Sequence, residues 1–251
     1  MNVATRLTWL TRVGFAVRGV LYLVIAILIA RLGRAEDPGG AVQYLGAHSG
    51  ILLIVIAAGL IAYGVWRLAD AAFNVERHDD DAKGVAERVG AALSGAVHFL
   101  LAWQAIHLFQ GARASGDSTE QGVRMALDLP AGPALVVVAG ILLAALGVYQ
   151  LVRAAKGSFL KHLEPRIARH PWAKWSGRLG YAARGVIFAL SGWFIVQAGL
   201  EADADQAGGM AQALAWLESP VDLLVAAGLF GFGLFSLIEA RFRVLRDVRV
   251  G

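Results

Sequence analysis

RVGFAVRGVLY at residues 12 to 22 and RLGYAARGVIF at residues 178 to 188 are two copies of one phrase, and each copy opens a long apolar run. An altered third copy, RVGAALSGAVH, occupies residues 88 to 98. A second apolar run follows each copy and ends in a related phrase: GVWRLAD from Gly64, GVYQLVR from Gly147 and GLFSLIE from Gly233. The alternation predicts a unit of two long helices that occurs three times.

The composition indicates a membrane protein. Of the 251 residues, 57% are hydrophobic and 17% charged, and the mean hydropathy is +0.59, whereas soluble domains are about half apolar and a quarter charged. The apolar stretches can cross a hydrocarbon core of about 30 Å at about 1.5 Å per residue. They predict six spans, at residues 13–31, 50–70, 88–109, 134–154, 178–199 and 221–240. The predicted fold is therefore an all-α integral membrane protein with six transmembrane helices.

The repeats also predict how these helices are arranged. Two spans per unit bring every unit into the membrane in the same direction, so the units are parallel repeats about an axis along the membrane normal. Three such hairpins close most simply into a ring with pseudo-threefold symmetry. We expect one membrane domain of residues 1–251, with repeats at 9–73, 85–155 and 175–242 and a basic loop at 156–174. Short helices at the outer surface are predicted at GAVQYL from Gly40, GVRMAL from Gly122 and GMAQAL from Gly209.

The repeated phrase R-x-G-[FY]-A-x-R-G-V-x-[YF], the closing phrase G-[VL]-[WYF] and the three-hairpin plan resemble a bacterial multi-pass family described as domain of unknown function 1206. The resemblance extends from residue 9 to residue 242. It implies the architecture and residence in a membrane, and it brings no established activity. The middle unit departs from the phrase, with Ser94 in place of Arg and His98 in place of the aromatic residue.

The distribution of Lys and Arg predicts the orientation. Only four of the 23 basic residues fall in one set of connections, namely Arg31, Arg34, Arg113 and Arg124. By the positive-inside rule the N- and C-termini then face the cytoplasm, in the bacterial cytoplasmic (inner) membrane. The basic residues flank apolar spans, so anionic lipid headgroups are the predicted partners and nucleic acid is not. The surface expected to meet lipid consists of Lys156, Lys161, Arg166, Arg169 and Lys174 in an amphipathic loop, which could also dock a cytoplasmic protein.

Ion pairs are predicted from a correlation between the units. The odd helices carry Arg18, Ser94 and Arg184 at equivalent positions, and the even helices carry Asp70, Arg153 and Glu239 six residues after the glycine. The unit that lacks the odd-helix arginine also lacks the acid. This predicts pairs of Arg18 with Asp70 and of Arg184 with Glu239 inside their own hairpins, with a structural clamp favoured over a functional gate.

A central cavity between the odd helices is the second predicted site. His98 lies near the middle of its span, where an ionisable residue is expensive and a functional role is a reasonable hypothesis. The alternative is a neutral imidazole hydrogen-bonded across helices, on a face where small residues pack. The cavity candidates are His98, Tyr22, Ser94, Phe188 and Gln104.

Enzymatic chemistry has little support in the sequence. The chain has no cysteine, and it lacks a phosphate-binding glycine loop, an H-E-x-x-H motif and a G-x-S-x-G elbow. We therefore expect no catalytic residue, no cofactor and no metal site, and the charged stretch from Glu76 is interpreted as a solvated turn. The favoured function is a binder or transporter of a small solute or lipid. The alternative is a structural or assembly protein with a packed core and a partner-binding loop.

Overall fold

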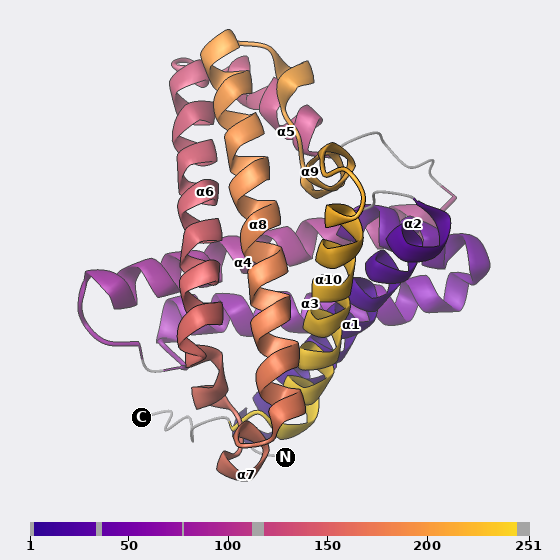
Figure 1. Cartoon of the computed structure of the whole chain (residues 1–251), viewed down its shortest axis with the longest axis vertical. Helices are drawn as coiled ribbons and strands as arrows, with labels where there is room; N and C mark the ends of the chain where they lie inside the picture. Colours follow the sequence, from indigo (N-terminus) through magenta and orange to yellow (C-terminus); the bar gives the residue numbers. More distant parts are fainter. Residues whose placement is uncertain (1–2, 34–36, 77, 112–117, 245–251) are drawn as a thin grey trace.

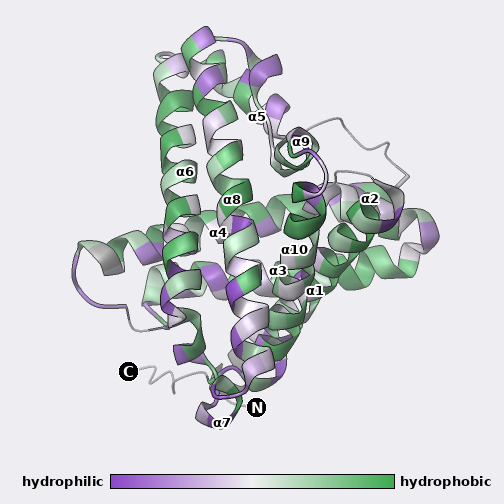
Figure 2. Cartoon of the chain, viewed as in Figure 1, coloured by the Kyte–Doolittle hydropathy of each residue, from purple (hydrophilic) through white to green (hydrophobic). Residues whose placement is uncertain are grey.

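Six long helices dominate the structure (Figure 1). A computed structural model of the chain describes residues 3–33, 37–76, 78–111 and 118–244. The long helices are α1 (Val3–Leu32), α3 (Gly50–Phe73), α4 (Ala82–Phe109), α6 (Gly132–Lys156), α8 (Pro171–Glu201) and α10 (Val221–Phe242). Each is long and apolar enough to cross a membrane, and in Figure 2 their apolar residues run along the helices while polar residues gather at ends and turns. The predicted all-α fold with six apolar helices is confirmed.

Shorter helices join the long ones. The two long helices of each unit are separated by α2 (Pro38–His48), by α5 (Ser118–Leu127), or by η2 (Ala204–Gln206) with α9 (Met210–Trp216), so the three predicted short segments are helical. The Asp37 side chain starts α2 by accepting the Gly40 N–H at 2.7 Å, which satisfies an otherwise free helix-end donor. At the other end of the bundle, η1 (Ser158–His162) and α7 (Pro165–Ala168) connect α6 to α8.

Three long helices begin several residues before the predicted spans, namely α1, α4 and α8. Hydropathy marks the part of a helix that matches the hydrocarbon core, whereas helix ends follow capping. Asp81 caps α4 by accepting the Gly84 N–H at 2.7 Å, and Pro171 occupies the first turn of α8. Several helix ends lie in left-handed conformation, among them Asn74 (φ 51°) after α3, Gly157 (φ 69°) after α6 and Ala202 (φ 53°) after α8. Each of these caps closes its helix with a backbone hydrogen bond.

A glycine contact recurs between each unit and the next. The even helix of one unit crosses the odd helix of the following unit in three pairs, α3–α4, α6–α8 and α10–α1. At each crossing two glycines bring the backbones together, as small residues do between membrane helices. A Cβ atom added to Gly19 would lie 2.9 Å from Gly233 O, one added to Gly95 3.2 Å from Gly64 O, and one added to Gly185 2.9 Å from Gly147 O.

A closed threefold ring is not confirmed, because the middle unit is open. The helices of the outer units pack together as α1–α3 and α8–α10, but α4 and α6 are not among the pairs of described helices that pack along their length. A Cβ added to Gly14 or Gly180 would meet a neighbouring residue at 2.5 Å, whereas one at the equivalent Gly90 would meet nothing within 4 Å. In Figure 1, α3 and α4 run across the direction of α6 and α8. The most apolar window of α4 and of α6 is only 22% buried, against 61% in α1.

Candidate functional site

The crossing of α10 with α1 contains a fully partnered arginine. Arg18 immediately precedes Gly19, and it reaches the residues three and six positions after Gly233. Its Nε donates to Ser236 Oγ at 3.1 Å, and its two terminal nitrogens donate to Tyr63 Oη and Glu239 Oε2, each at 2.7 Å. Glu239 is 2% exposed. The result is a buried ion pair that joins the first and the last long helix.

A second arginine extends this pair beyond the end of α10. Arg243 donates to the other Glu239 oxygen and to Glu76 Oε1, so it bridges two carboxylates. Burial opposes ionisation of Glu76, yet the neighbouring Arg243 guanidinium lowers the pKa of the Glu76 carboxyl to about 2. Burial alone would lower the pKa of Arg243, but Glu76 and Glu239 together raise it. Both groups are therefore charged at neutral pH, and they connect the turn after α3 to the end of α10.

The two predicted ion pairs, Arg18 with Asp70 and Arg184 with Glu239, do not form. Arg18 pairs with Glu239 instead of Asp70, and Asp70 lies 3.4 Å from Arg67 and 3.1 Å from His78. Arg184 has no carboxylate within 4.0 Å among the described residues, so its predicted pair with Glu239 is not formed. The reason is the crossing pattern: α10 presents Glu239 to α1 of the next unit and not to α8, whereas Asp70 faces Arg67 of its own helix and His78 of the following turn.

Arg184 therefore differs from Arg18 although their sequence contexts match. Among the described residues its guanidinium contacts aromatic rings and no carboxylate. It lies 5.5 Å from the centroid of Tyr22, 4.8 Å from that of Phe188 and 4.4 Å from that of Phe232. Its Nε is buried with no hydrogen-bond partner among the described residues. Aromatic faces attract a cation, but they accept none of the directional hydrogen bonds that a guanidinium offers.

The crossing of α6 with α8 explains why Arg184 lacks an acid. Counting from Gly147 as from Gly233, Gln150 stands where Ser236 stands, and Arg153 stands where Glu239 stands. Gln150 is 4% exposed, with a buried Oε1 that has no described partner. The Arg153 guanidinium lies 4.7 Å from the Tyr181 ring and 5.9 Å from the Tyr149 ring. The position of the acid is therefore taken by a second cation, while the Arg184 guanidinium lies against rings of α1, α8 and α10. Below, Arg153 of α6 and Arg184 of α8 are called the α6–α8 arginines.

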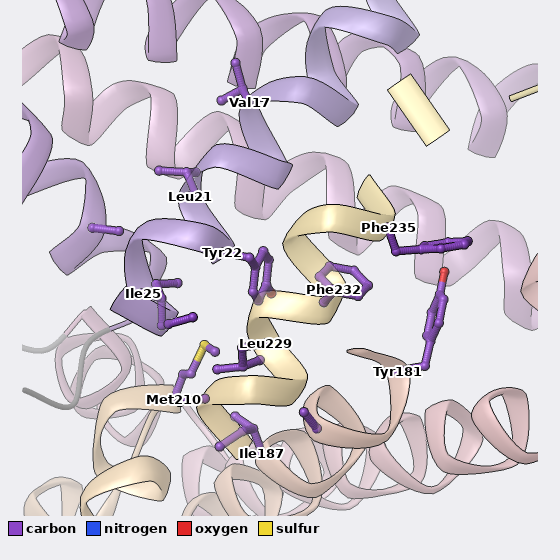
Figure 3. Close-up of a cluster of buried hydrophobic side chains, with 14 of the residues drawn as sticks. Val17, Leu21, Tyr22, Ile25, Tyr181, Ile187, Met210, Leu229, Phe232 and Phe235 are labelled. Carbon is purple, nitrogen blue, oxygen red and sulfur yellow. The ribbon is translucent and has the colours of Figure 1, made fainter. Parts of the chain in front are cut away.

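The predicted cavity residues fall in three places. Tyr22 and Phe188 lie against Arg184, and Tyr22 packs on Phe232 at 4.8 Å in the core between α1, α8 and α10 (Figure 3). His98 donates from Nδ1 to the Ser94 carbonyl at 2.7 Å and stacks on Tyr63 at 4.3 Å. Gln104 lies beside Gly39 of α2, where a Cβ would meet its Oε1 at 2.9 Å. Large side chains fill the core drawn in Figure 3, including Ile25, Ile187, Leu229 and Phe232.

The five basic residues of the predicted lipid surface lie on the outside of the protein, whereas part of the apolar side of the loop does not. Lys156, Lys161, Arg166, Arg169 and Lys174 are all exposed. The apolar side chains were expected to face lipid, but Phe159, Leu163 and Ile167 are at most 5% exposed and pack into the protein core. Part of the loop is held there by backbone bonds to the segment after α10, Glu164 N–H to Phe242 O at 3.0 Å and Val244 N–H to His162 O at 2.9 Å. Trp172 and Trp175 remain exposed.

One group of potential metal ligands was missed in the sequence. Asp70, Glu76 and His78 each offer a ligand atom, and these atoms lie within 4.8 Å of one another. The sequence pattern predicts an ion pair for Asp70, and it places Glu76 and His78 in a solvated turn. The available signal was the spacing of a carboxylate, a second carboxylate and a histidine across a helix end.

Six apolar helices in three two-helix units, joined through buried charges, define a multi-pass helical membrane protein. The chain belongs to the family described as Domain of Unknown Function 1206, which it matches over residues 13–74, 89–157 and 179–243; the resemblance seen in the sequence is confirmed. It is also similar to the uncharacterized protein YxxB of Bacillus subtilis (strain 168), with 29% identity over 252 residues, covering 94% of this chain and 92% of that protein. No solved structure matches the chain.

Proposed function

We propose that this protein binds an anionic small solute or lipid within the membrane and holds its acidic group at the α6–α8 arginines. The observation that carries the proposal is Arg184, a cation in a membrane-spanning helix without a carboxylate partner among the described residues. Such a cation is costly in a bilayer. A phosphate or carboxylate from a ligand would supply the missing charge, and arginine recognises both groups through paired N–H donors.

The open middle unit supports access from the bilayer. Because α4 and α6 do not pack along their length, α6 exposes an apolar surface that includes Ile141, Leu142 and Val138, each more than half exposed. An amphiphile could lay its chains on this surface and bring its headgroup to Arg153, near the basic end of the helix. Basic pockets between membrane helices recognise acidic lipid headgroups in this way.

The membrane and its orientation form part of the proposal. We place the protein in the bacterial cytoplasmic membrane with both termini in the cytoplasm, supported by the excess of Lys and Arg at that end. Acidic headgroups are then the partners of the exposed basic loop residues, and nucleic acid is not a partner. The proposal covers binding or movement of a ligand and not catalysis, because guanidinium and amide groups hold an anion without exchanging a proton at neutral pH.

A structural or assembly role is the second candidate. It is supported by the packed core between α1, α8 and α10 in Figure 3, and by glycine crossings that bring the helix backbones into contact. In that case the protein would hold a fixed shape in the membrane, and the basic loop would bind a partner or lipid.

The test is native mass spectrometry of protein released from nanodiscs of phosphatidylcholine with added phosphatidylglycerol. We expect one retained acidic lipid, lost in Arg153→Glu, which puts an acid at the position equivalent to Glu239. The matched control is Arg88→Glu, which makes the same change of charge at an arginine that donates to the Ala71 and Ala72 carbonyls.

A second arm separates lipid from soluble anions. Protein in pure phosphatidylcholine discs is titrated with inorganic phosphate, and a rise in melting temperature that Arg153→Glu abolishes would identify a soluble anion as the ligand class. If neither anion binds, or if both bind equally well to Arg153→Glu, the proposal fails and the structural role takes its place.

A further inference from the structure

The turn between α3 and α4 fixes a histidine beside a buried carboxylate. Asp70 is fully buried in the last turn of α3, and its Oδ1 accepts the Glu76 N–H at 2.8 Å. Asn74, in left-handed conformation, accepts the His78 N–H at 2.7 Å and donates to the His78 carbonyl at 3.0 Å. The side chains of Asp70 and Asn74 therefore fix the backbone at Glu76 and at His78.

Both ring nitrogens of His78 face carboxylates. Nδ1 lies 2.7 Å from Glu87 Oε2, and Nε2 lies 3.1 Å from Asp70 Oδ2. Nδ1 is thus engaged by Glu87, and Nε2 is turned towards the carboxylate of Asp70. A cation held between Nε2 and this carboxylate would bond to both groups.

We propose that Asp70, Glu76 and His78 form a binding site for a divalent transition-metal ion of the zinc class. The ligands are a carboxylate oxygen of each acid and Nε2 of His78, which lie within 4.8 Å of one another. Ligands about 2.0–2.2 Å from a tetrahedral zinc ion lie about 3.3–3.6 Å apart, so side-chain rotations that draw the three ligand atoms together complete the site. An imidazole with two carboxylates favours zinc, manganese or ferrous iron over calcium and magnesium.

Glu87 holds the ring nitrogen of His78 that points away from the proposed metal ion. A carboxylate on the distal nitrogen fixes the tautomer of a metal-binding histidine and strengthens it as a ligand. Glu87 is itself held by the Tyr149 hydroxyl, which donates to its Oε1 at 3.2 Å. The site thus connects the end of α3 and the start of α4 with α6.

Carboxylates gather around Nε2 of His78. Asp70 lies 3.1 Å from it, and ligand atoms of Asp70, Glu76 and His78 lie within 4.8 Å of one another. Arg67 and Arg243 pair with two of these acids, and Arg18 pairs with Glu239. His78 itself stands between the carboxylates of Asp70 and Glu87. This inference does not depend on the proposed ligand of the α6–α8 arginines.

The experiment measures metal binding directly. Full-length protein without a polyhistidine tag is stripped with a chelator in nanodiscs and titrated with Zn²⁺ by calorimetry, and with Co²⁺ by absorption spectroscopy. We expect one ion per chain, lost in His78→Gln and in Asp70→Asn. Because Asp70→Asn also removes the partner of Arg67 and can impair folding, Glu87→Gln is the second variant; it should retain binding with about 10- to 100-fold lower affinity.

The controls are Asp80→Asn, an exposed acid of the same turn, and His48→Gln, an exposed histidine on another helix, and both should bind as the unchanged protein does. Absence of one-to-one binding, or binding that survives both His78→Gln and Asp70→Asn, overturns the proposal.

Discussion

Arg18 and Arg184 occupy the same position in two copies of one phrase, yet their surroundings are opposite. Arg18 has a carboxylate, a phenol and a hydroxyl within hydrogen-bond distance. The guanidinium of Arg184 instead contacts three aromatic rings. The difference lies in the neighbouring even helix, which carries Glu239 at one crossing and Arg153 at the other. The same backbone contact can therefore accompany either an ion pair or a cation with no carboxylate among the described residues. Which one forms depends on the residues that the facing helix presents, Ser236 and Glu239 or Gln150 and Arg153.

Of the changes that distinguish the two crossings, removing the Glu239 carboxylate should lower the free energy of unfolding most. Glu239→Gln leaves both Arg18 and Arg243 without their shared carboxylate, and breaking a buried pair by removing one partner costs about 3–5 kcal/mol. The measurement is the free energy of unfolding in mixed micelles. Arg153→Gln, at the equivalent position of the other crossing, removes a cation and should cost far less. Equal losses in the two variants would show that the crossings do not differ in charge pairing.

Disturbing the glycine contact that both crossings share should have the second-largest effect on the free energy of unfolding. A Cβ on Gly147 would lie 2.6 Å from Ala189 N and 2.7 Å from Gly185 O, so Gly147→Ala should lower the free energy of unfolding by about 1–3 kcal/mol. Gly90→Ala is the control, because nothing lies within 4 Å of its added Cβ; alanine should be neutral or stabilising there. A destabilising Gly90→Ala would indicate that α4 packs closely at this position after all.

The hydroxyl group of Tyr63 should contribute less to the free energy of unfolding than Glu239 or the glycine contact does. Tyr63→Phe removes the acceptor 2.7 Å from Arg18 while Glu239 and Ser236 remain, so the free energy of unfolding should fall by about 1 kcal/mol. Phenylalanine already occupies the equivalent position, Phe232, beside Arg184. Thermal unfolding of Tyr63→Phe and Glu239→Gln, singly and combined, gives the coupling between the two contacts. Strict additivity would argue against one shared network around Arg18.

Near neutral pH the smallest effect should come from His162, beside the extension of the ion pair. Burial, reinforced by the Arg243 guanidinium, lowers the pKa of His162 from 6.5 to about 3. Between these values the unfolded chain binds a proton that the folded chain does not, so stability is complete above pH 6.5 and falls as the pH decreases towards 3. We expect melting temperatures at pH 7.5, 6.5 and 5.5 to fall in that order. His162→Gln should flatten the decline, whereas the exposed His170→Gln should leave it unchanged.

The helices and their repetition could be predicted from the sequence because both follow from local patterns. Hydropathy located six helices, and the glycine phrases located α2, α5 and α9. The importance of Arg18 and Glu239 was also visible, since charges in apolar runs need partners. Their pairing was not, because repeats identify equivalent positions without saying which neighbouring helix each position faces. The ligand set of Asp70, Glu76 and His78 was hidden for a similar reason: it depends on the left-handed turn at Asn74, which reverses the chain after α3.

The pair between Arg18 and Glu239 joins residues 221 positions apart, and this separation has a consequence for synthesis. At about 5–20 residues per second, roughly 10–45 s pass between the synthesis of the two residues. During that time α1 lies in the bilayer with the charged Arg18 side chain, while Glu239, its carboxylate partner, has not yet been synthesised. The bundle therefore cannot become fixed unit by unit as it leaves the ribosome. Arg18 of the first helix can pair with Glu239 only after α10 has been inserted, and this insertion completes the assembly.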